Sequence, residues 1–284
     1  MTSILSIQSS VAYGHAGNSA ATFPLMRMGV EVWPVLTVHF SNHTGYGQWR
    51  GPLIPAEDVA EVITGIDERG VLSHCDAVLS GYQGGEEVGA VILDAAALVK
   101  QRNPNAVYCC DPVMGDVGRG FFVRPGIPEF MKERVVPQAD LITPNQFELE
   151  FLSGHRIHTQ ADVLTAVDAV RATGPDVVLV TSVIHDESAP ETLQLIAVSS
   201  DGAWSVTTPR LPLEVSGSGD ITAATFLRHW LAERDLAAAL EHTAASVYGV
   251  LKVTHDAGSY ELRLVEAQDE FVAPTHAFEV TRIR

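Results

Sequence analysis

The chain has 284 residues, of which 46% are hydrophobic and 19% are charged, and its formal net charge is −17. A chain of this size can bury about three quarters of its unfolded surface. The strong negative charge repels nucleic acid and anionic membrane surfaces, so both are excluded as partners. A bound nucleotide would therefore need cations or helix N-termini placed locally around its phosphates.

Elements of strand and helix type alternate along the sequence. In chain order, we expect strand 4–8, helix 18–28, strand 30–38, helix 56–68, strand 76–79, helix 86–101, strand 106–110, strand 139–142, helix 146–152, helix 160–172, strand 177–181, a hairpin of strands 193–199 and 204–207, helix 218–233 and helix 236–254. Several strands are unbroken apolar runs, which is typical of a parallel sheet covered on both faces. We predict an α/β fold, doubly wound, with a mostly parallel central sheet and helices on both faces, as a single domain over residues 1–284.

Two segments interrupt this alternation. Residues 38–53 are polar, aromatic and glycine-rich, which indicates a small flap inserted at the edge of the sheet. Residues 115–126 contain four glycines and indicate a mobile lid.

The cysteines and the N-terminal segment bear on localisation. Cys75, Cys109 and Cys110 have no C-x-x-C spacing, which favours small buried side chains in a reducing compartment. Residues 1–7 lack the basic and long apolar regions of a signal peptide. No apolar run reaches the roughly 18 residues that a membrane span needs. We therefore expect a cytoplasmic protein with no membrane partner.

The most informative motif is the string Gly217-Ser218-Gly219-Asp220, which leads directly into an apolar helical run. The first turn of a helix has unpartnered backbone N–H groups and a partial positive charge, and glycines let a ligand approach them. This turn is therefore a candidate anion site. Asp220 beside a bound phosphate would add repulsion, unless it accepts a proton from an attacking hydroxyl. The alternative for Asp220 is a simple helix cap.

Polar residues follow several predicted strands, and in an open α/β sheet ligands bind beyond the carboxyl ends of the strands. Asp111 and Asp116 follow one strand, and Asn145 and Glu148 follow the next. Such oxygen ligands suit Mg²⁺ bound together with phosphates. The alternatives are a turn residue before proline for Asp111 and a capping box for the Asn145–Glu148 pair.

Other chemistries have weaker support. The sequence has no G-x-x-x-x-G-K-[ST] string, no protein-kinase motif set and no G-x-S-x-G string. The pairs His39/His43 and His155/His158 have no further ligands nearby, which argues against a zinc site.

The motifs at 111–116, 145–148 and 217–220 together resemble the ribokinase-like superfamily. The segments 13–18, 40–46, 80–82 and 139–148 narrow the resemblance to the pyridoxal kinase family, over residues 4 to about 270. The resemblance implies ATP-dependent phosphorylation of the 5′-hydroxymethyl group of pyridoxal in vitamin B6 salvage, giving pyridoxal 5′-phosphate and ADP. Pyridoxine and pyridoxamine are further candidate substrates, and a homodimer is implied.

The resemblance also implies residue roles. Asp220 would be the general base, and Gly217, Ser218 and Gly219 would form the anion hole. The substrate would be bound by Ser9, Val38, Phe40, Thr44, Gly45, Tyr82 and Asp220. The ATP site would comprise Asp111, Asp116, Thr143, Asn145, Glu148, Thr181 and Ser182 along the phosphates and metal, and Thr208, Pro209, Arg210 and Leu211 near the adenine. Mg²⁺ would be held by Glu148, Asp111 and Asp116. Phe122 would lie in the lid.

The chain departs from the family pattern at a few positions. Ser218 stands where threonine is commoner, and the segment 115–126 is shorter than in some members. Thr181 stands where some bacterial members carry lysine. Without that charge, phosphate neutralisation should depend more on Mg²⁺, with a monovalent cation such as K⁺ as a further candidate.

Two other functions stay open at this point. One is a kinase of the same superfamily acting on hydroxymethylpyrimidine or a sugar. The other is a non-catalytic module that binds a nucleotide or pyridoxal 5′-phosphate. A pure phosphate binder gains nothing from a carboxylate at position 220, which argues against the second.

Overall fold

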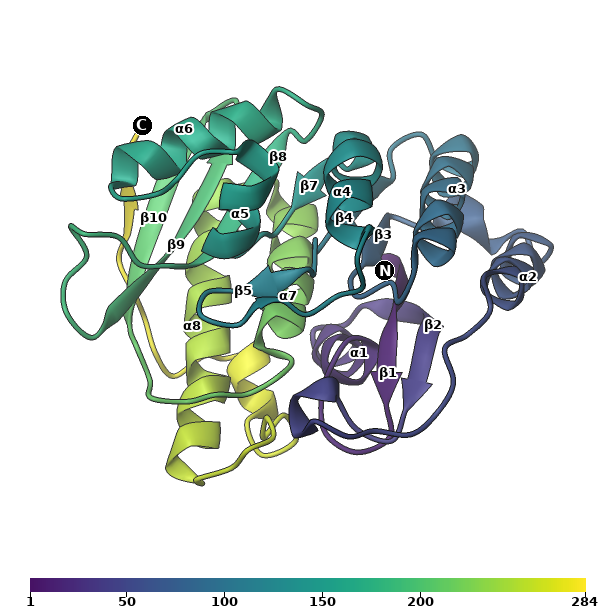
Figure 1. The fold of residues 1–284 in the computed structure, drawn as a ribbon, viewed down its shortest axis with the longest axis horizontal. Helices are drawn as coiled ribbons and strands as arrows, with labels where there is room; N and C mark the ends of the chain where they lie inside the picture. Colours follow the sequence, from purple (N-terminus) through teal and green to yellow (C-terminus); the bar gives the residue numbers. More distant parts are fainter.

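A mixed nine-stranded sheet forms the centre of the computed structural model, which describes residues 1–284, in the order β11-β10-β9-β8-β7-β4-β3-β1-β2 (Figure 1). The parallel strands are β1 (Ser3–Val11), β2 (Glu31–Phe40), β3 (Ala77–Ser80), β4 (Val107–Cys110), β7 (Leu141–Ile142) and β8 (Val177–Val183). The antiparallel strands β9 (Thr192–Ser199), β10 (Gly202–Pro209) and β11 (Val280–Arg282) complete one edge. The predicted α/β fold with a mostly parallel sheet is confirmed.

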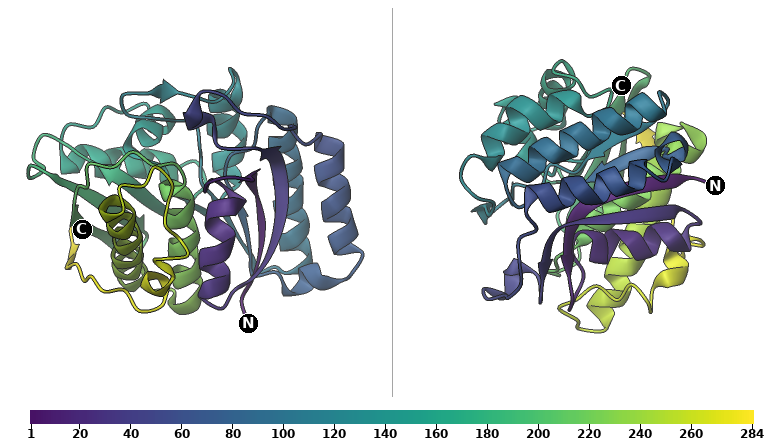
Figure 2. Two further views of the ribbon diagram at one scale, coloured as in Figure 1. Left: turned by 90° about the horizontal axis from the view of Figure 1, so that it is seen from below. Right: turned by 90° about the vertical axis from the view of Figure 1, so that its right-hand side faces the viewer.

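Helices cover both faces of this sheet (Figure 2). One layer contains α2 (Ala56–Asp67), α3 (Glu86–Arg102), α4 (Ile127–Phe130), α5 (Gln146–Ser153) and α6 (Gln160–Arg171), and the other contains α1 (Asn18–Arg27), α7 (Ser218–Glu233) and α8 (Leu236–Asp256). The predicted long helices are all present, with ends within two residues of those expected. None of the helices combines the length and apolar character needed to cross a membrane.

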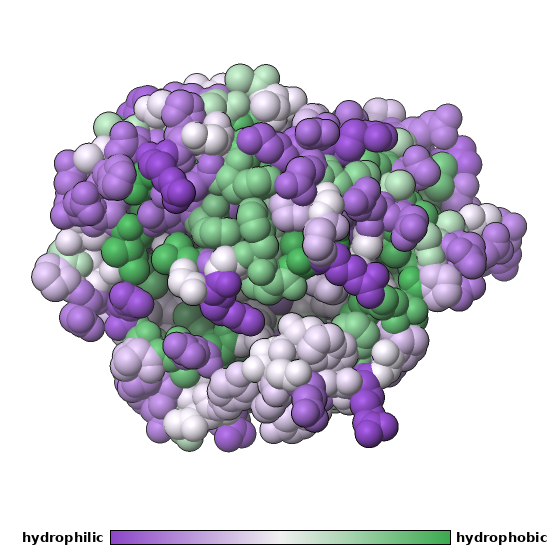
Figure 3. All heavy atoms as spheres, viewed as in Figure 1, coloured by the Kyte–Doolittle hydropathy of each residue, from purple (hydrophilic) through white to green (hydrophobic).

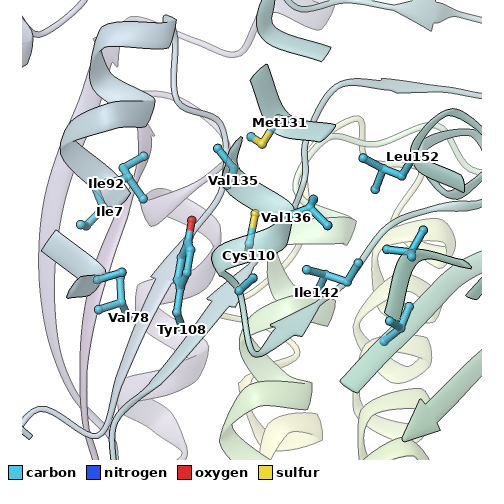
Figure 4. Close-up of a cluster of buried hydrophobic side chains, with 14 of the residues drawn as sticks. Ile7, Val78, Ile92, Tyr108, Cys110, Met131, Val135, Val136, Ile142 and Leu152 are labelled. Atoms are coloured by element: carbon cyan, nitrogen blue, oxygen red, sulfur yellow. The ribbon is translucent and has the colours of Figure 1, made fainter. Parts of the chain in front are cut away.

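The alternation of side chains along the parallel strands produces two separate cores. Leu5 and Cys110 belong to the core beneath α2–α6, whereas their neighbours Ile4 and Cys109 belong to the core beneath α1, α7 and α8. Tyr108 is fully buried in the first core, near Val78 and Cys110 (Figure 4). Its hydroxyl lies 2.9 Å from the Ser80 hydroxyl. Strands that are apolar on both faces therefore hold the two helix layers together, as a buried parallel sheet requires.

Strand β2 extends into the segment that was predicted as the flap. β2 pairs with β1 as far as the Val11–Phe40 register, beyond a bulge, so residues 38–40 lie in the sheet. The rest of this segment begins at Ser41, and a short 3₁₀ turn at Thr44–Tyr46 lies within it. An isolated bridge between Val38 and Leu53 closes its base. The strand therefore runs two residues further than the sequence indicated, and the flap over about residues 38–53 stays a prediction.

Several short elements were not predicted. In the lid segment, β5 (Gly115–Asp116) and β6 (Gly120–Phe121) form a small antiparallel hairpin. Phe121 at its end packs edge-on against Phe147 and Phe151 of α5, with ring centroids 5.0 Å apart in both pairs. The remaining short helical turns are Val71–His74, Met131–Val135, Val136–Gln138 and Gln268–Phe271. These elements are too short to have a readable hydrophobic period.

Candidate active site

A cavity of about 230 Å³ opens at the carboxyl ends of the parallel strands. Figure 3 shows apolar side chains gathered across the middle of one face of the molecule, with polar residues around them. All but four of the predicted catalytic, substrate-binding and ATP-binding residues line the cavity. The residues that line it are Ser9, Val38, Phe40, Thr44, Gly45, Tyr82, Asp111, Asp116, Thr143, Asn145, Glu148, Thr181, Ser182, Gly217, Ser218, Gly219 and Asp220. The fold therefore brings the polar strand ends and the glycine turn to one site.

The turn before α7 has an open backbone. Gly217 is the residue that precedes the helix, with a φ of 90°, and no side chain caps the helix there. A β-carbon at Gly217 would collide with the backbone oxygen of His15, so only glycine fits. The first N–H groups of α7 are consequently free to meet an anion. Asp220 lies inside the first turn rather than at the capping position, so the simple capping role does not apply to it.

The carboxyl group of Asp220 lies at the wall of the cavity. Its withdrawal from solvent raises its pKa above the usual aspartate value, and hydrogen bonding by the Gly17 backbone amide acts in the opposite direction. A carboxylate that is poorly solvated is a stronger proton acceptor than an exposed one.

Two further carboxyl groups, those of Asp111 and Glu148, line the cavity on one side of Asp220. Asp111 is 6% exposed and accepts a hydrogen bond of 3.0 Å from the Thr143 hydroxyl. Burial, and then the charges of Glu148 and Asp220, raise the pKa of Asp111 well above its usual range. Burial likewise raises the pKa of Glu148 to about 8. No lysine or arginine pairs with these groups, so their ionised forms lack a counter-charge within the protein.

The capping box predicted at the start of α5 is present. Glu148 N–H donates to Asn145 Oδ1 at 2.9 Å, and Asn145 N–H donates to Glu148 Oε2 at the same distance. Glu148 Oε1 also accepts a hydrogen bond of 2.8 Å from Met114 N–H. The Asn145 amide group donates to the Gly115 carbonyl at 2.8 Å. These contacts hold the base of the lid against α5, so the capping residues Asn145 and Glu148 have a structural role.

The opposite end of the cavity is apolar. Val11, Val38 and Phe40 form a small cluster separate from the two main cores, and Ala16 and Tyr82 pack against it. Thr37 donates a hydrogen bond of 2.7 Å to the Tyr82 carbonyl and so fixes the loop after β3. Walls of this kind, with few polar groups among them, are typical of a pocket for a small aromatic molecule.

Four predicted residues lie outside the cavity. Thr208 and Pro209 end β10, where they pair with Leu193 and Thr192 of β9, and Arg210 and Leu211 follow them. Their proximity to an adenine stays a prediction. Thr181 and Ser182 do line the cavity, and Ser182 has a φ of 54°, which is unusual for a residue other than glycine.

The sequence interpretation missed several cavity residues. Arg119 is the only lysine or arginine that lines the cavity, and its guanidinium carbon lies 5.2 Å from the centre of the Phe122 ring. An arginine within a glycine-rich segment was the available signal. His43 and Ser216 also line the cavity. His43 is weighed in the sequence as a metal ligand and as part of the segment 40–46, and its partner Glu261 lies 218 residues further along the chain.

The residues alone do not form a closed metal site. No group of three or more histidine, cysteine, aspartate or glutamate side chains is arranged to hold an ion. A divalent cation at this site would therefore need oxygen atoms from a bound substrate in addition to those of the protein.

Comparisons with known proteins match the chain to kinases. A family model described as phosphomethylpyrimidine kinase matches residues 70–264. The pyridoxal kinase PdxY of Rubrobacter xylanophilus is 59% identical over 281 residues, which cover 99% of this chain and 97% of that protein. The pyridoxal kinase PdxY of Leifsonia xyli is 57% identical over 280 residues, which cover 99% of each chain.

A solved structure shares the fold. The pyridoxal kinase of Leishmania donovani in complex with ADP and pyridoxamine superposes with a TM-score of 0.93 at 27% identity, over 100% of both chains. The same protein in complex with ADP and pyridoxine gives a TM-score of 0.91 at 28% identity, over 99% of both chains.

Proposed function

The chain belongs to the pyridoxal kinase family, and from this membership we propose that it transfers the γ-phosphoryl group of ATP to the 5′-hydroxymethyl group of pyridoxal. The products are pyridoxal 5′-phosphate and ADP. Relatives at 59% and 57% identity over nearly the full length carry the pyridoxal kinase name, and solved relatives bind ADP with pyridoxamine or pyridoxine.

The observation that carries the proposal is the position of Asp220. Its carboxyl group lies in the first turn of α7, beside the free amides of Gly217–Gly219 and within the same cavity as the apolar walls. An anion-binding turn alone needs no carboxylate. A carboxylate with a raised pKa, next to that turn, suits removal of a proton from an alcohol that attacks phosphorus.

The reaction follows from these positions. Val38, Phe40 and Tyr82 enclose the pyridine ring, while Ser9 provides a polar contact at its edge. Asp220 accepts the proton of the hydroxymethyl group as its oxygen attacks the γ-phosphorus. The bond to the β-phosphate oxygen breaks, and ADP leaves. The amides of Gly217, Ser218 and Gly219 stabilise the negative charge on the phosphoryl group in transfer.

The carboxylate end fits a divalent cation. Asp111 and Glu148 are buried without a cationic partner, and both have raised pKa values for that reason. Asp116 lies on the same wall at the start of the lid. These three carboxyl groups do not close around an ion by themselves. We propose that Mg²⁺ is held between them, namely Asp111, Asp116 and Glu148, and the phosphates of ATP. Bound there, Mg²⁺ would supply charge neutralisation to the phosphates.

Arg119 supplies the cation that position 181 lacks. It lines the cavity at the tip of the β5–β6 hairpin, whose base is fastened to α5 through Asn145 and Glu148. A guanidinium group offers several donors in a planar fork that matches phosphate oxygens. We propose that Arg119 contacts the ATP phosphates when the lid lies over them.

The test is a substrate panel analysed by mass spectrometry. The protein is incubated with Mg·ATP and, separately, pyridoxal, pyridoxine, pyridoxamine, hydroxymethylpyrimidine and a hexose. We expect phosphorylated pyridoxal with matching ADP release, and no product from the sugar. The matching family model makes hydroxymethylpyrimidine the second candidate substrate, so a higher kcat/KM for it than for pyridoxal would reverse the assignment. Tight pyridoxal binding without ADP release would instead indicate a binding module.

Two further features are part of the proposal. A homodimer, implied by family resemblance, can be tested by sedimentation equilibrium. The need for a monovalent cation can be tested by replacing K⁺ with tetramethylammonium at constant ionic strength.

A further inference from the structure

A chain of hydrogen bonds joins the flap to the turn before α7. His43 Nε2 lies 2.9 Å from Glu261 Oε1, and His43 Nδ1 lies 3.0 Å from the Ser216 hydroxyl. The Tyr46 hydroxyl donates to the same Glu261 oxygen at 2.8 Å. The other oxygen, Glu261 Oε2, accepts a hydrogen bond of 2.9 Å from the His15 backbone N–H. Glu261 therefore contacts three separate positions through one carboxyl group.

An ionised Glu261 and a neutral His43 ring would set the direction of these bonds. An ionised carboxylate can only accept hydrogen bonds, so His43 must donate through Nε2. In the neutral imidazole, Nδ1 is then an acceptor, and the Ser216 hydroxyl donates to it. The lone pairs of the Ser216 oxygen stay available on the cavity side, since Ser216 lines the cavity. Through this network Glu261, which does not itself line the cavity, orients the hydroxyl oxygen of Ser216, which does.

The site of Glu261 is closed and specific. Its side chain is 12% exposed and that of His43 is 5% exposed. A β-carbon on Gly14 would collide with the Glu261 carboxyl group, so the loop before α1 has a glycine where it passes over it. Tyr260, the preceding residue, also reaches the flap, with its hydroxyl 3.4 Å from the Gly45 carbonyl. Loop 14–15, flap residues 43–46 and Ser216 are therefore held together by the segment that follows α8.

We propose that Glu261 is a positioning residue for the acceptor alcohol. Through His43 and Ser216 it holds flap residues 43–46 against the turn before α7, so that Thr44 and Gly45 form a fixed wall of the cavity. This inference rests on the proposed function in one respect, which is that the alcohol, rather than the nucleotide, binds at the apolar end of the cavity beside the flap. Loss of the Glu261 carboxylate should weaken binding of the alcohol and leave the nucleotide site, which is built on α5 and the lid, unchanged.

The experiment compares Glu261→Ala with a matched control, Glu270→Gln. Glu270 is also a buried glutamate after α8, and it accepts hydrogen bonds from the Thr275 backbone N–H at 2.9 Å and hydroxyl at 2.7 Å, away from the flap. Removing hydrogen bonds to a charged group costs about tenfold or more in an equilibrium constant. We expect Glu261→Ala to raise KM for pyridoxal about tenfold, with KM for ATP changed less than about twofold. Glu270→Gln should leave the ratio of the two KM values unchanged.

A second variant keeps the carboxylate and removes one donor. Tyr46→Phe deletes one hydrogen bond to Glu261 Oε1 and preserves the ring packing, in which the Tyr46 and His43 centroids lie 4.7 Å apart. We expect it to fold as the parent does and to raise KM for pyridoxal about threefold. The double variant with Glu261→Ala should be no worse than Glu261→Ala alone, because both changes act on the same oxygen.

Two outcomes would overturn the inference. One is an unchanged KM for pyridoxal in both variants. The other is an equal loss for pyridoxal and ATP that tracks a lower Tm, which would assign Glu261 a purely structural role. Equilibrium binding of pyridoxal and ADP to the parent and to each variant distinguishes a failure of the Glu261 inference from a failure of the proposed function. A parent that binds pyridoxal without phosphorylating it would refute the proposed function alone, whereas a parent that does not bind pyridoxal would refute both.

Discussion

The two ends of the cavity are built in different ways. The carboxylate end takes Asp111, Thr143 and Glu148 from the ends of the adjacent strands β4 and β7 and from the start of α5. The apolar end combines the ends of β1, β2 and β3 with the flap, and is held by Ser216 and Glu261 from the other end of the chain. The carboxylate end is thus drawn from one stretch of the chain, residues 111–148, whereas the other end joins segments up to 218 residues apart.

The two ends also differ in charge. At the carboxylate end, burial raises the pKa values of Asp111 and Glu148, and neighbouring carboxylate charges add to both rises. At the apolar end, the buried Glu261 carboxylate accepts hydrogen bonds from His43, Tyr46 and the His15 backbone N–H. The carboxylate end therefore has no counter-charge within the protein, whereas the carboxylate of Glu261 has hydrogen-bond partners on both oxygens. Asp220 lies where the two ends meet.

The largest effect is expected at Asp220, which lies between the two ends of the cavity. Asp220→Asn removes the proton acceptor and keeps the side-chain shape. We expect kcat to fall about 10²–10⁴-fold while ADP binding stays within about twofold of the parent, as measured by steady-state kinetics and calorimetry. Asp220 must be ionised to act as the base, and burial raises its pKa. As the pH is lowered, the parent should therefore lose activity at a higher pH than an ordinary aspartate would require. An Asn variant with the parent kcat would remove Asp220 from the chemistry.

The next effect concerns the carboxylate end. Arg119→Ala should lower kcat/KM for ATP about tenfold, less than a fully buried anion-binding donor would, because Arg119 is exposed in the lid. Arg119→Lys should recover part of the loss by restoring the charge. Arg134→Ala is the matched control, since Arg134 also lies over a phenylalanine ring, 6.0 Å from the centroid of Phe130, but does not line the cavity. Equal losses in the two alanine variants would argue against phosphate contact by Arg119.

The smallest effect is on stability. Between the usual aspartate pKa and the raised pKa of Asp111, the folded protein retains a proton that the unfolded chain has lost, so stability falls as pH rises through this window. Asp111→Asn cannot ionise and should have a higher Tm than the parent at pH 8, with a smaller difference at pH 5, in protein treated with EDTA. Calorimetry at the two pH values measures this. A variant less stable than the parent at pH 8 would contradict the raised pKa.

Much of the carboxylate end could be read from the sequence. The capping box at Asn145 and Glu148 and the glycine turn at Gly217 depend on residues within a few positions of one another, and both are present. The strand ends could be placed at one edge because parallel strands share a direction. The structure adds that Glu148 is engaged by backbone amides of Met114 and Gly115, at 2.8 and 3.4 Å, which no local pattern revealed.

The flap and its anchor could not be read in this way. His43 was considered as a metal ligand without a partner, since nothing near it in sequence suggested Glu261. The sequence also carried no sign that β2 continues to Phe40, which pairs with Val11 of β1 beyond a bulge. The predicted adenine contacts Thr208–Leu211 lie outside the cavity, and their role awaits a nucleotide complex.

The sequence by itself determined the layers of the fold and the glycine turn before α7, because hydrophobic period, glycines and capping residues act over a few positions. Only the tertiary structure decided which carboxyl groups lose solvent and which side chains meet across the cavity. Burial and contacts between Ser216, His43 and Glu261 arise from the packing of segments more than 40 residues apart. A pKa shift or a hydrogen-bond chain of this kind is a property of the folded environment, and the residues that make it carry no local mark.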